Sequence, residues 1–338
     1  MTATCEHQFI DRDTGQVVTE KFIGDRCVTF LYNRLWENAP ALFKILTSAR
    51  MSSLLGYYHY DLHLEHRRHN GVDLLARLHV DGEECLDPPH YYDTVRKVFE
   101  RKIRYQDVRP MDDDPSAVVS PADSRVLLGS LSAHSHLFIK DKFFSFRELL
   151  GNRQPWTDRF SAGDFAVFRL TPDKYHYNHL PVSGIVVDFF FLAGGYHCCN
   201  PSAVIAAGTP FSKNRRIVTI IDTDVKGGTG IGPVAMIEIV ALMIGDIVQC
   251  YSEQGYNDPR PISPGMFLKK GCPKSLYRPG SSTDVLLFAK DRVDFSRDII
   301  ENQCRTDAGS RFTAGFSTPM VETDVRVRST IGYRNVKS

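Results

Sequence analysis

The sequence predicts an α+β protein, with N-terminal helices followed by a largely antiparallel β core. Apolar residues recur at helical spacing over about 28–58, whereas short apolar runs bounded by glycine and proline dominate from 105 onward. Of the 338 residues, 42% are hydrophobic and 24% charged, an ordinary globular balance. We therefore expect one domain over 1–338, in which 1–70 forms an N-terminal hairpin and helical region and 105–338 forms the β core.

The bulk properties argue against several classes of protein. The net charge of +1 gives no global electrostatic case for a nucleic-acid partner. Eight scattered cysteines without a CxxC pair disfavour a zinc ribbon or a secreted disulfide scaffold, and favour reduced thiols in a cytoplasmic protein. The polar N-terminus lacks the apolar core of a signal peptide. The stretch 231–251 is long enough to cross a membrane, but charged Glu238 and Asp246 interrupt it, so we expect two buried strands broken near Gly245.

The first predicted element is a hairpin over 8–23, with its turn at Asp13-Thr14-Gly15. Helices follow over 28–58, broken at Asn38-Ala39-Pro40. Residues 71–108 are also predicted to be helical, with a loop at the Pro-Pro pair.

The helices over 28–58 allow two interpretations. Lys44, Arg50 and the basic cluster at 66–68 accompany their apolar residues. Such helices can pack on their own domain, or they can lie in a membrane interface with basic residues toward anionic lipid. The sequence leaves both interpretations open.

Three polar groups further along the chain are candidates for a site. Asp123 stands directly before the apolar strand Val126-Leu127-Leu128, where it can bond local backbone N–H groups or orient a histidine. His176 and His179 lie between two strands predicted within 164–192. No third ligand stands at a recognisable spacing, so we expect no metal. The flanking tyrosines instead indicate a lined pocket.

The third group is a pair of serines, Ser281 and Ser282, between Gly280 and the apolar strand that begins at Val285. An ordinary turn explains this stretch. Alternatively, a serine hydroxyl held beside a permissive glycine attacks the carbonyl before it. That attack gives an ester, and elimination leaves a keto group at a new N-terminus.

The motifs SPAD at 120–123, YHYNH at 175–179 and GSST at 280–283 together resemble the phosphatidylserine decarboxylase family. The segments FIDRDTGQVVTEKFIGD and TPMVETDVRV extend this resemblance over most of the chain. The resemblance implies a self-cleaving carboxy-lyase that makes its own pyruvoyl cofactor from a serine. The pyruvoyl carbonyl would form a Schiff base with the substrate amine and accept the electrons released with carbon dioxide.

The resemblance also implies roles for the site residues. Asp123 orients and charges His179, which acts as the base for cleavage and elimination at the serine. His176 lies near the substrate carboxylate and helps decarboxylation or reprotonation. We favour Ser282 as the cleaved serine, because Thr283 follows it and the strand fixes the register of everything after it. Ser281, which directly follows a glycine as is usual in the family, is the alternative.

Three functions remain open at this point. The first is conversion of phosphatidylserine to phosphatidylethanolamine and CO2 at a membrane surface. The second is the same chemistry on a free amino acid, including aromatic ones, by a soluble enzyme. It is favoured by departures from the family pattern at Cys198-Cys199 and at Asp246, whose charge would disfavour a phosphate group. The third is a member that never matures and acts as a binding or structural protein. We also expect a homodimer in the cytoplasm, with peripheral membrane contact.

Overall fold

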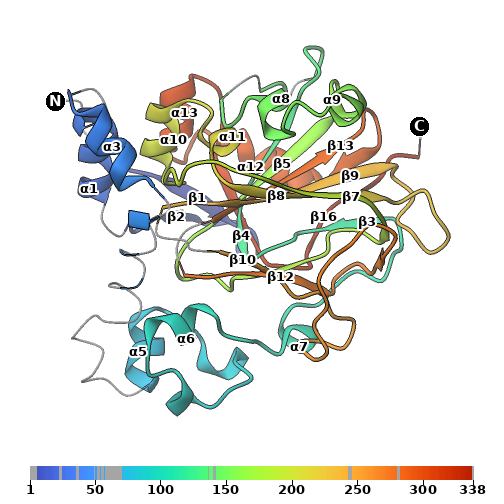
Figure 1. Cartoon of the computed structure of the whole chain (residues 1–338), viewed down its shortest axis with the longest axis horizontal. Coiled ribbons are helices and arrows are strands. Elements are labelled where there is room, and N and C mark those ends of the chain that lie inside the picture. The colour runs from blue at the N-terminus through green and yellow to red at the C-terminus, as the bar shows by residue number, and fades with distance from the viewer. Residues whose placement is uncertain are drawn as a thin grey trace.

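The computed structural model describes residues 6–22, 25–35, 38–48, 50–51, 54, 57, 71–135, 137–139, 142–242, 246–279 and 282–336. Three features named above lie outside these residues: the basic cluster at 66–68, the predicted break between two strands near Gly245, and the alternative serine Ser281. The fold is α+β, as the sequence predicts (Figure 1).

A ten-stranded sheet forms the centre of the molecule (Figure 1). Its strand order is β11-β7-β8-β9-β13-β5-β4-β15-β1-β2, and only β1 and β15 run parallel. The strands are β1 (Gln8–Asp11), β2 (Val17–Thr19), β4 (Ser124–Ser130), β5 (Asp164–Leu170), β7 (Gly184–Leu192), β8 (Arg216–Asp222), β9 (Pro233–Val240), β11 (Phe267–Leu268), β13 (Ser282–Phe288) and β15 (Glu322–Val325).

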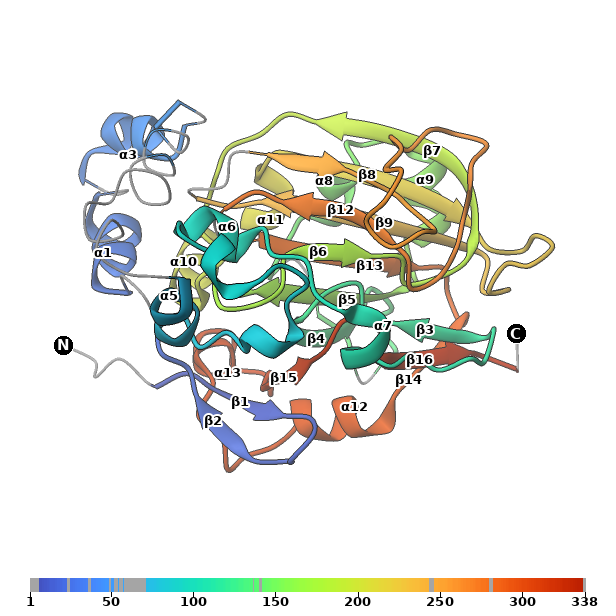
Figure 2. The same ribbon diagram turned by 90° about the horizontal axis from the view of Figure 1, so that it is seen from below.

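Two three-stranded sheets cover one face of the large sheet (Figure 2). One has the order β10-β12-β6 and the other β14-β16-β3. Their strands are β3 (Ala117–Val119), β6 (Tyr177–His179), β10 (Ile247–Gln249), β12 (Pro273–Tyr277), β14 (Val293–Phe295) and β16 (Thr330–Arg334).

Helices cover the other face of the large sheet, and the N-terminal helices lie at one flank of the molecule (Figure 1). Those on the face are α8 (Phe146–Leu149), α9 (Gln154–Phe160), α10 (Pro201–Ala207), α11 (Pro210–Lys213) and α13 (Arg311–Phe316). The N-terminal helices are α1 (Asp25–Phe30), the π-helical turn η1 (Leu31–Leu35) and α3 (Pro40–Leu46). Short helices over 71–108 lie beneath the β10-β12-β6 sheet (Figure 1). They are α5 (Gly71–Arg77), η4 (Gly82–Glu84), η5 (Pro89–Tyr91), α6 (Val95–Phe99) and α7 (Tyr105–Val108). The remaining helix, α12 (Arg297–Gln303), precedes β15 in the chain.

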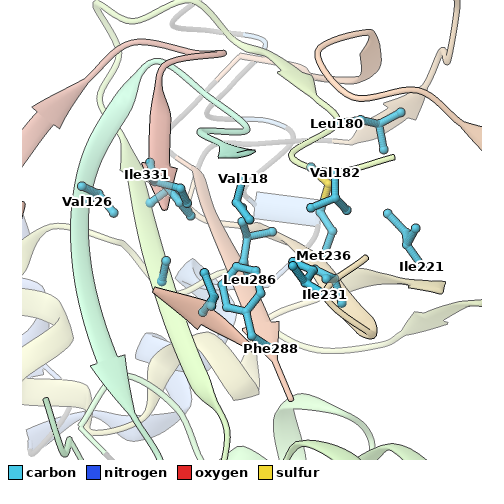
Figure 3. Close-up of a cluster of buried hydrophobic side chains, with 14 of the residues drawn as sticks. Val118, Val126, Leu180, Val182, Ile221, Ile231, Met236, Leu286, Phe288 and Ile331 are labelled. Carbon is cyan, nitrogen blue, oxygen red and sulfur yellow. The ribbon is translucent and has the colours of Figure 1, made fainter. Parts of the chain in front are cut away.

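Strand β13 contributes side chains to two hydrophobic cores, one on each face of the large sheet. It pairs over its whole length with β5 on one side and β9 on the other. Leu286 and Phe288 enter the core between the sheets, where Figure 3 shows them near Val118 of the β14-β16-β3 sheet. Val285 and Leu287 enter the core beneath the helices. Alternation along a strand therefore turns its even-numbered residues, from 282 to 288, toward the small sheets.

Most predicted elements are confirmed. The hairpin β1–β2 has its turn where expected, with Gly15 at φ +70°. The break in the N-terminal helices lies at Ala39, which caps α3. The prediction for 71–108 is wrong in detail, because this region consists of short helical segments and not of long helices. The stretch 231–251 contains strands β9 and β10 as predicted, and no helix within the described residues is long and apolar enough to cross a membrane.

A buried ion cluster ties the N-terminal hairpin to the far end of the chain. Arg169 on β5 lies 2.7 Å from the carboxylate of Glu20 and 2.5 Å from that of Glu322. His7 contacts Glu322 at 2.7 Å, and Arg125 contacts Glu20. The two guanidinium groups supply the charge that the two buried carboxylates require.

We expect Arg169→Met to lower the free energy of unfolding by about 3–5 kcal/mol, because it leaves buried carboxylates without a partner. Chemical denaturation measures this. Arg297→Met is the matched control, since Arg297 pairs with Glu301 on the surface and its side chain is 90% exposed. Equal, small changes in the two variants would show that the cluster is not needed for stability.

Candidate active site

Ser282 is the first residue of β13 and lies in the middle of the large sheet. It is directly opposite Leu170 of β5 and Val240 of β9, so these three side chains share the face toward the small sheets. Its side chain is fully buried, and its hydroxyl has no hydrogen-bond partner among the described residues. A buried hydroxyl without a partner costs free energy, so its position calls for an explanation.

His179 lies at the end of β6 and is held at both ring nitrogens. Nδ1 is 2.9 Å from the carbonyl oxygen of Gly271, and Nε2 is 3.0 Å from the hydroxyl of Tyr175. Because a carbonyl only accepts, Nδ1 carries the hydrogen and Nε2 accepts one from Tyr175. Burial lowers the pKa of His179 to about 3, so the ring is neutral at physiological pH.

A hydrogen-bonded chain extends from His179 into the neighbouring loop. The hydroxyls of Tyr175 and Tyr256 are 2.7 Å apart, and the Ile103 amide donates to Tyr256 at 3.1 Å. The ring of Tyr105 packs edge-on against His179 with 4.7 Å between centroids. The tyrosines beside the histidines were visible in the sequence, but Tyr256 carries no local signal.

His176 is fully buried beside the connection that leads to Ser282. Its carbonyl accepts a hydrogen bond from the Tyr277 amide at 3.1 Å. Its ring stacks on Phe99 of α6 at 3.5 Å, and neither ring nitrogen has a partner among the described residues. Burial lowers its pKa to about 3. A neutral imidazole without hydrogen bonds can meet a polar group of a substrate.

Asp123 is buried and bound by Arg109. The distances are 3.0 Å from Nε to Oδ1 and 2.8 Å from Nη2 to Oδ2, and the Val327 amide donates to Oδ1 at 2.7 Å. Burial acts to raise the pKa of Asp123, but the charge and hydrogen bonds of Arg109 outweigh it, and the pKa is lowered. Arg109 also binds Glu84 with both terminal nitrogens at 2.8 Å. Asp123 is therefore ionised, and sequence reasoning did not identify its partner.

The predicted site residues lie in one region without forming a hydrogen-bonded triad. The charge of Asp123 acts on both His176 and His179, raising their pKa values against the effect of burial. However, Asp123 bonds Arg109 and not His179, and no hydrogen bond within the described residues joins Ser282 to either histidine. On β6, Asn178 faces the large sheet whereas His179 points to the opposite side.

A buried polar layer lies next to Ser282. Asp284 and Glu238 are directly opposite each other on β13 and β9, and both are fully buried. Lys274 donates to Glu238 at 2.5 Å, and the Tyr277 hydroxyl donates to Asp284 at 2.7 Å. Burial, reinforced by the charge of Glu238, raises the pKa of Asp284 well above its usual range. Apolar residues surround Glu238 and follow Asp284, and they concealed this layer in the sequence.

Together, the fold and these side chains define an α+β protein with buried histidines, buried carboxylates and a buried serine near the start of a central strand. A family model described as phosphatidylserine decarboxylase matches residues 95–314. A protein named phosphatidylserine decarboxylase proenzyme, from Chlamydia trachomatis serovar L2, is 29% identical over 334 residues, covering 98% of this chain and 99% of its own. A protein of the same name from Fusobacterium nucleatum is 27% identical over 296 residues, covering 87% of this chain and 91% of its own. The chain belongs to the phosphatidylserine decarboxylase family, as its motifs indicated, and is a carboxy-lyase.

Proposed function

We propose that the chain is a precursor that cleaves itself before Ser282 and then converts phosphatidylserine to phosphatidylethanolamine and CO2. The observation that carries this proposal is the buried Ser282 hydroxyl without a partner, at the start of the central strand of a family member. The relatives' name, proenzyme, supports processing.

Cleavage at Ser282 balances without an external oxidant or reductant. The hydroxyl attacks the carbonyl carbon of residue 281, and the peptide C–N bond gives way to an ester. A base then removes the α-proton of residue 282, and residue 281 leaves as a carboxylate. Addition of water and loss of ammonia complete the keto group. When present, this pyruvoyl group supplies an electron-accepting carbonyl for decarboxylation.

His179 is the proposed base for these steps. It is neutral, and its Nε2 lone pair is the one that Tyr175 now occupies. Because His179 points away from the large sheet, the imidazole has to leave Tyr175 and turn toward Ser282 before it can act on the serine. The ionised Asp123 stabilises the imidazolium that forms. His176, whose nitrogens are unoccupied, is proposed to contact the substrate carboxylate and to move a proton during turnover.

The two chains produced by cleavage would stay together. The C-terminal product contains β13, which lies between β5 and β9, and β15, which lies between β1 and β4. Separation would expose strand edges and both hydrophobic cores, at a large cost in free energy. We therefore infer a mature enzyme built from both chains.

The N-terminal helices support a lipid substrate. One side of them docks on the core, since Tyr32 and Phe43 are buried in a cluster with Cys198. Large apolar side chains on these helices and the following described residues remain exposed: Phe30, Leu42, Ile45, Leu54 and Tyr57. One side of these helices therefore packs on the domain itself, and we propose that the exposed side meets the membrane interface. Cys198 anchors the helices, so the departure from the family pattern there is explained without a free amino-acid substrate.

We predict that the mature enzyme binds anionic vesicles and that Leu42→Ser with Ile45→Ser weakens binding at least about tenfold, because each substitution removes apolar area from the lipid contact. Added salt should weaken wild-type binding, since surface attraction is screened within roughly 8 Å. Vesicle sedimentation measures both effects. Val187→Ser with Phe191→Ser, on exposed β7, is the matched control.

The same preparation tests the substrate. Phosphatidylserine in these vesicles should be decarboxylated in preference to free amino acids. Faster turnover of a soluble amino acid by an enzyme that ignores vesicles would contradict the lipid proposal.

A further inference from the structure

Arg215 lies in one row with Ser282 across the large sheet. The Val240 amide donates to the Arg215 carbonyl at 3.1 Å, which continues the register between Arg216 and Ile239. Val240 is in turn directly opposite Ser282. Residues paired in this way share a face of the sheet, and neighbouring strands are about 4.8 Å apart. The Cα of Arg215 is therefore roughly 10 Å from that of Ser282, on the same face.

The guanidinium of Arg215 has one partly exposed neighbour, Asp246, and one buried neighbour, Tyr196. It lies 3.2 Å from the Asp246 carboxylate and 3.4 Å from the Tyr196 hydroxyl. The side chains of Arg215 and Asp246 are 39% and 47% exposed, so a ligand can reach this ion pair. The Asp246 carbonyl accepts from the Arg278 amide at 3.1 Å, which places the pair beside the connection from β12 to Ser282.

The same position adjoins the apolar surface of the N-terminal helices. The Tyr196 amide donates to the carbonyl of Thr47 at 3.2 Å, and Thr47 directly follows α3. The exposed side chains of Leu42 and Ile45 belong to that helix. Arg215 therefore lies between the serine and the surface proposed to meet lipid.

We propose that Arg215 binds the phosphodiester group of the substrate while its amine is held at residue 282. This inference rests on the proposed lipid function. In phosphatidylserine, a short carbon–oxygen path separates the amine from the phosphate, and the acyl chains extend beyond it. A guanidinium binds phosphate oxygens through two parallel hydrogen bonds. The protein offers its groups in the same order: Ser282 for the amine, Arg215 for the phosphate, and the apolar surface of the N-terminal helices for the acyl chains.

Asp246 has a defined place in this arrangement. Its carboxylate pairs with the Arg215 guanidinium in the absence of phosphate, so the substrate phosphate has to displace this carboxylate. A partly exposed ion pair is weak, which makes that exchange inexpensive. Asp246 is therefore paired with Arg215 before the substrate binds, and it competes with the phosphate for the guanidinium.

Steady-state kinetics of the mature enzyme test the assignment. Arg215→Gln should mature normally and raise KM for phosphatidylserine in mixed micelles about 10- to 100-fold, with kcat nearly unchanged, because a charged hydrogen bond is lost in ground and transition states alike. Asp246→Asn should leave KM unchanged or lower it. Arg297→Gln, which removes one exposed positive charge far from this site, controls for general attraction to anionic micelles.

A second readout does not depend on turnover or membranes. Wild-type enzyme should bind glycerophosphoethanolamine about 10- to 100-fold more tightly than ethanolamine in calorimetry, and Arg215→Gln should lose that preference. An unchanged preference, or equal KM values for Arg215→Gln and Arg297→Gln, would overturn the phosphate site while leaving the lipid function intact. Wild-type enzyme that does not decarboxylate phosphatidylserine at all would instead overturn the proposed function.

Discussion

Ser282→Ala is expected to leave the protein as one chain of 338 residues with no decarboxylase activity. The substitution removes only the hydroxyl that attacks the preceding carbonyl, and alanine fits the same buried strand position. Denaturing electrophoresis would show one band for this variant and two for the wild type. Circular dichroism and thermal unfolding would show that the variant is folded.

Ser281→Ala is the matched control for this experiment. Because β13 begins at Ser282 and pairs in register on both sides, we expect this neighbouring variant to be processed. Processing of Ser282→Ala together with a block in Ser281→Ala would move the cleavage point by one residue and contradict the assignment.

His179→Ala and Asp123→Asn are each expected to slow processing by about 10²–10⁴-fold, the usual effect of losing a general base. The first removes the imidazole, and the second removes the charge that stabilises its protonated form. Glu84→Gln is a matched control, because it changes the other carboxylate on Arg109 and leaves Asp123 in place. A time course of the two chains on a denaturing gel gives the rate.

The pH dependence adds an independent test of His179. Burial lowers its pKa to about 3, so the base form is lost only as the pH falls through that value. Wild-type processing should therefore change little between about pH 5 and pH 8 as far as His179 is concerned. A rate that falls with a midpoint near the ordinary histidine pKa of about 6.5 would contradict a buried neutral base. His176→Ala should process normally and then turn over poorly.

Local patterns were sufficient to predict the strands around the site. The apolar run after Ser282 predicted β13, because a strand buried on both faces needs such a run. The run after Asp123 predicted β4 in the same way. The glycine turn of the first hairpin was equally clear, since Gly15 adopts a positive φ. These features depend on residues close together in the chain.

Contacts between distant residues could not be predicted in this way. Tyr256 reaches Tyr175 across 81 positions of the chain, and nothing in its own neighbourhood indicates that contact. Asp284 is a second example, because nothing in its own neighbourhood indicates the cross-strand contact with Glu238. Such pairs follow from strand order, which single-sequence periodicity does not determine.

The most direct test of the central claim is the intact mass of the wild-type protein under denaturing conditions, with sequencing of both fragments. The proposed function predicts two chains, the second comprising residues 282–338 with a keto group in place of its amino terminus. Both chains should elute together under native conditions, since β13 and β15 are inserted in the large sheet. A single full-length chain that retains an unmodified Ser282 in a folded protein would contradict the account.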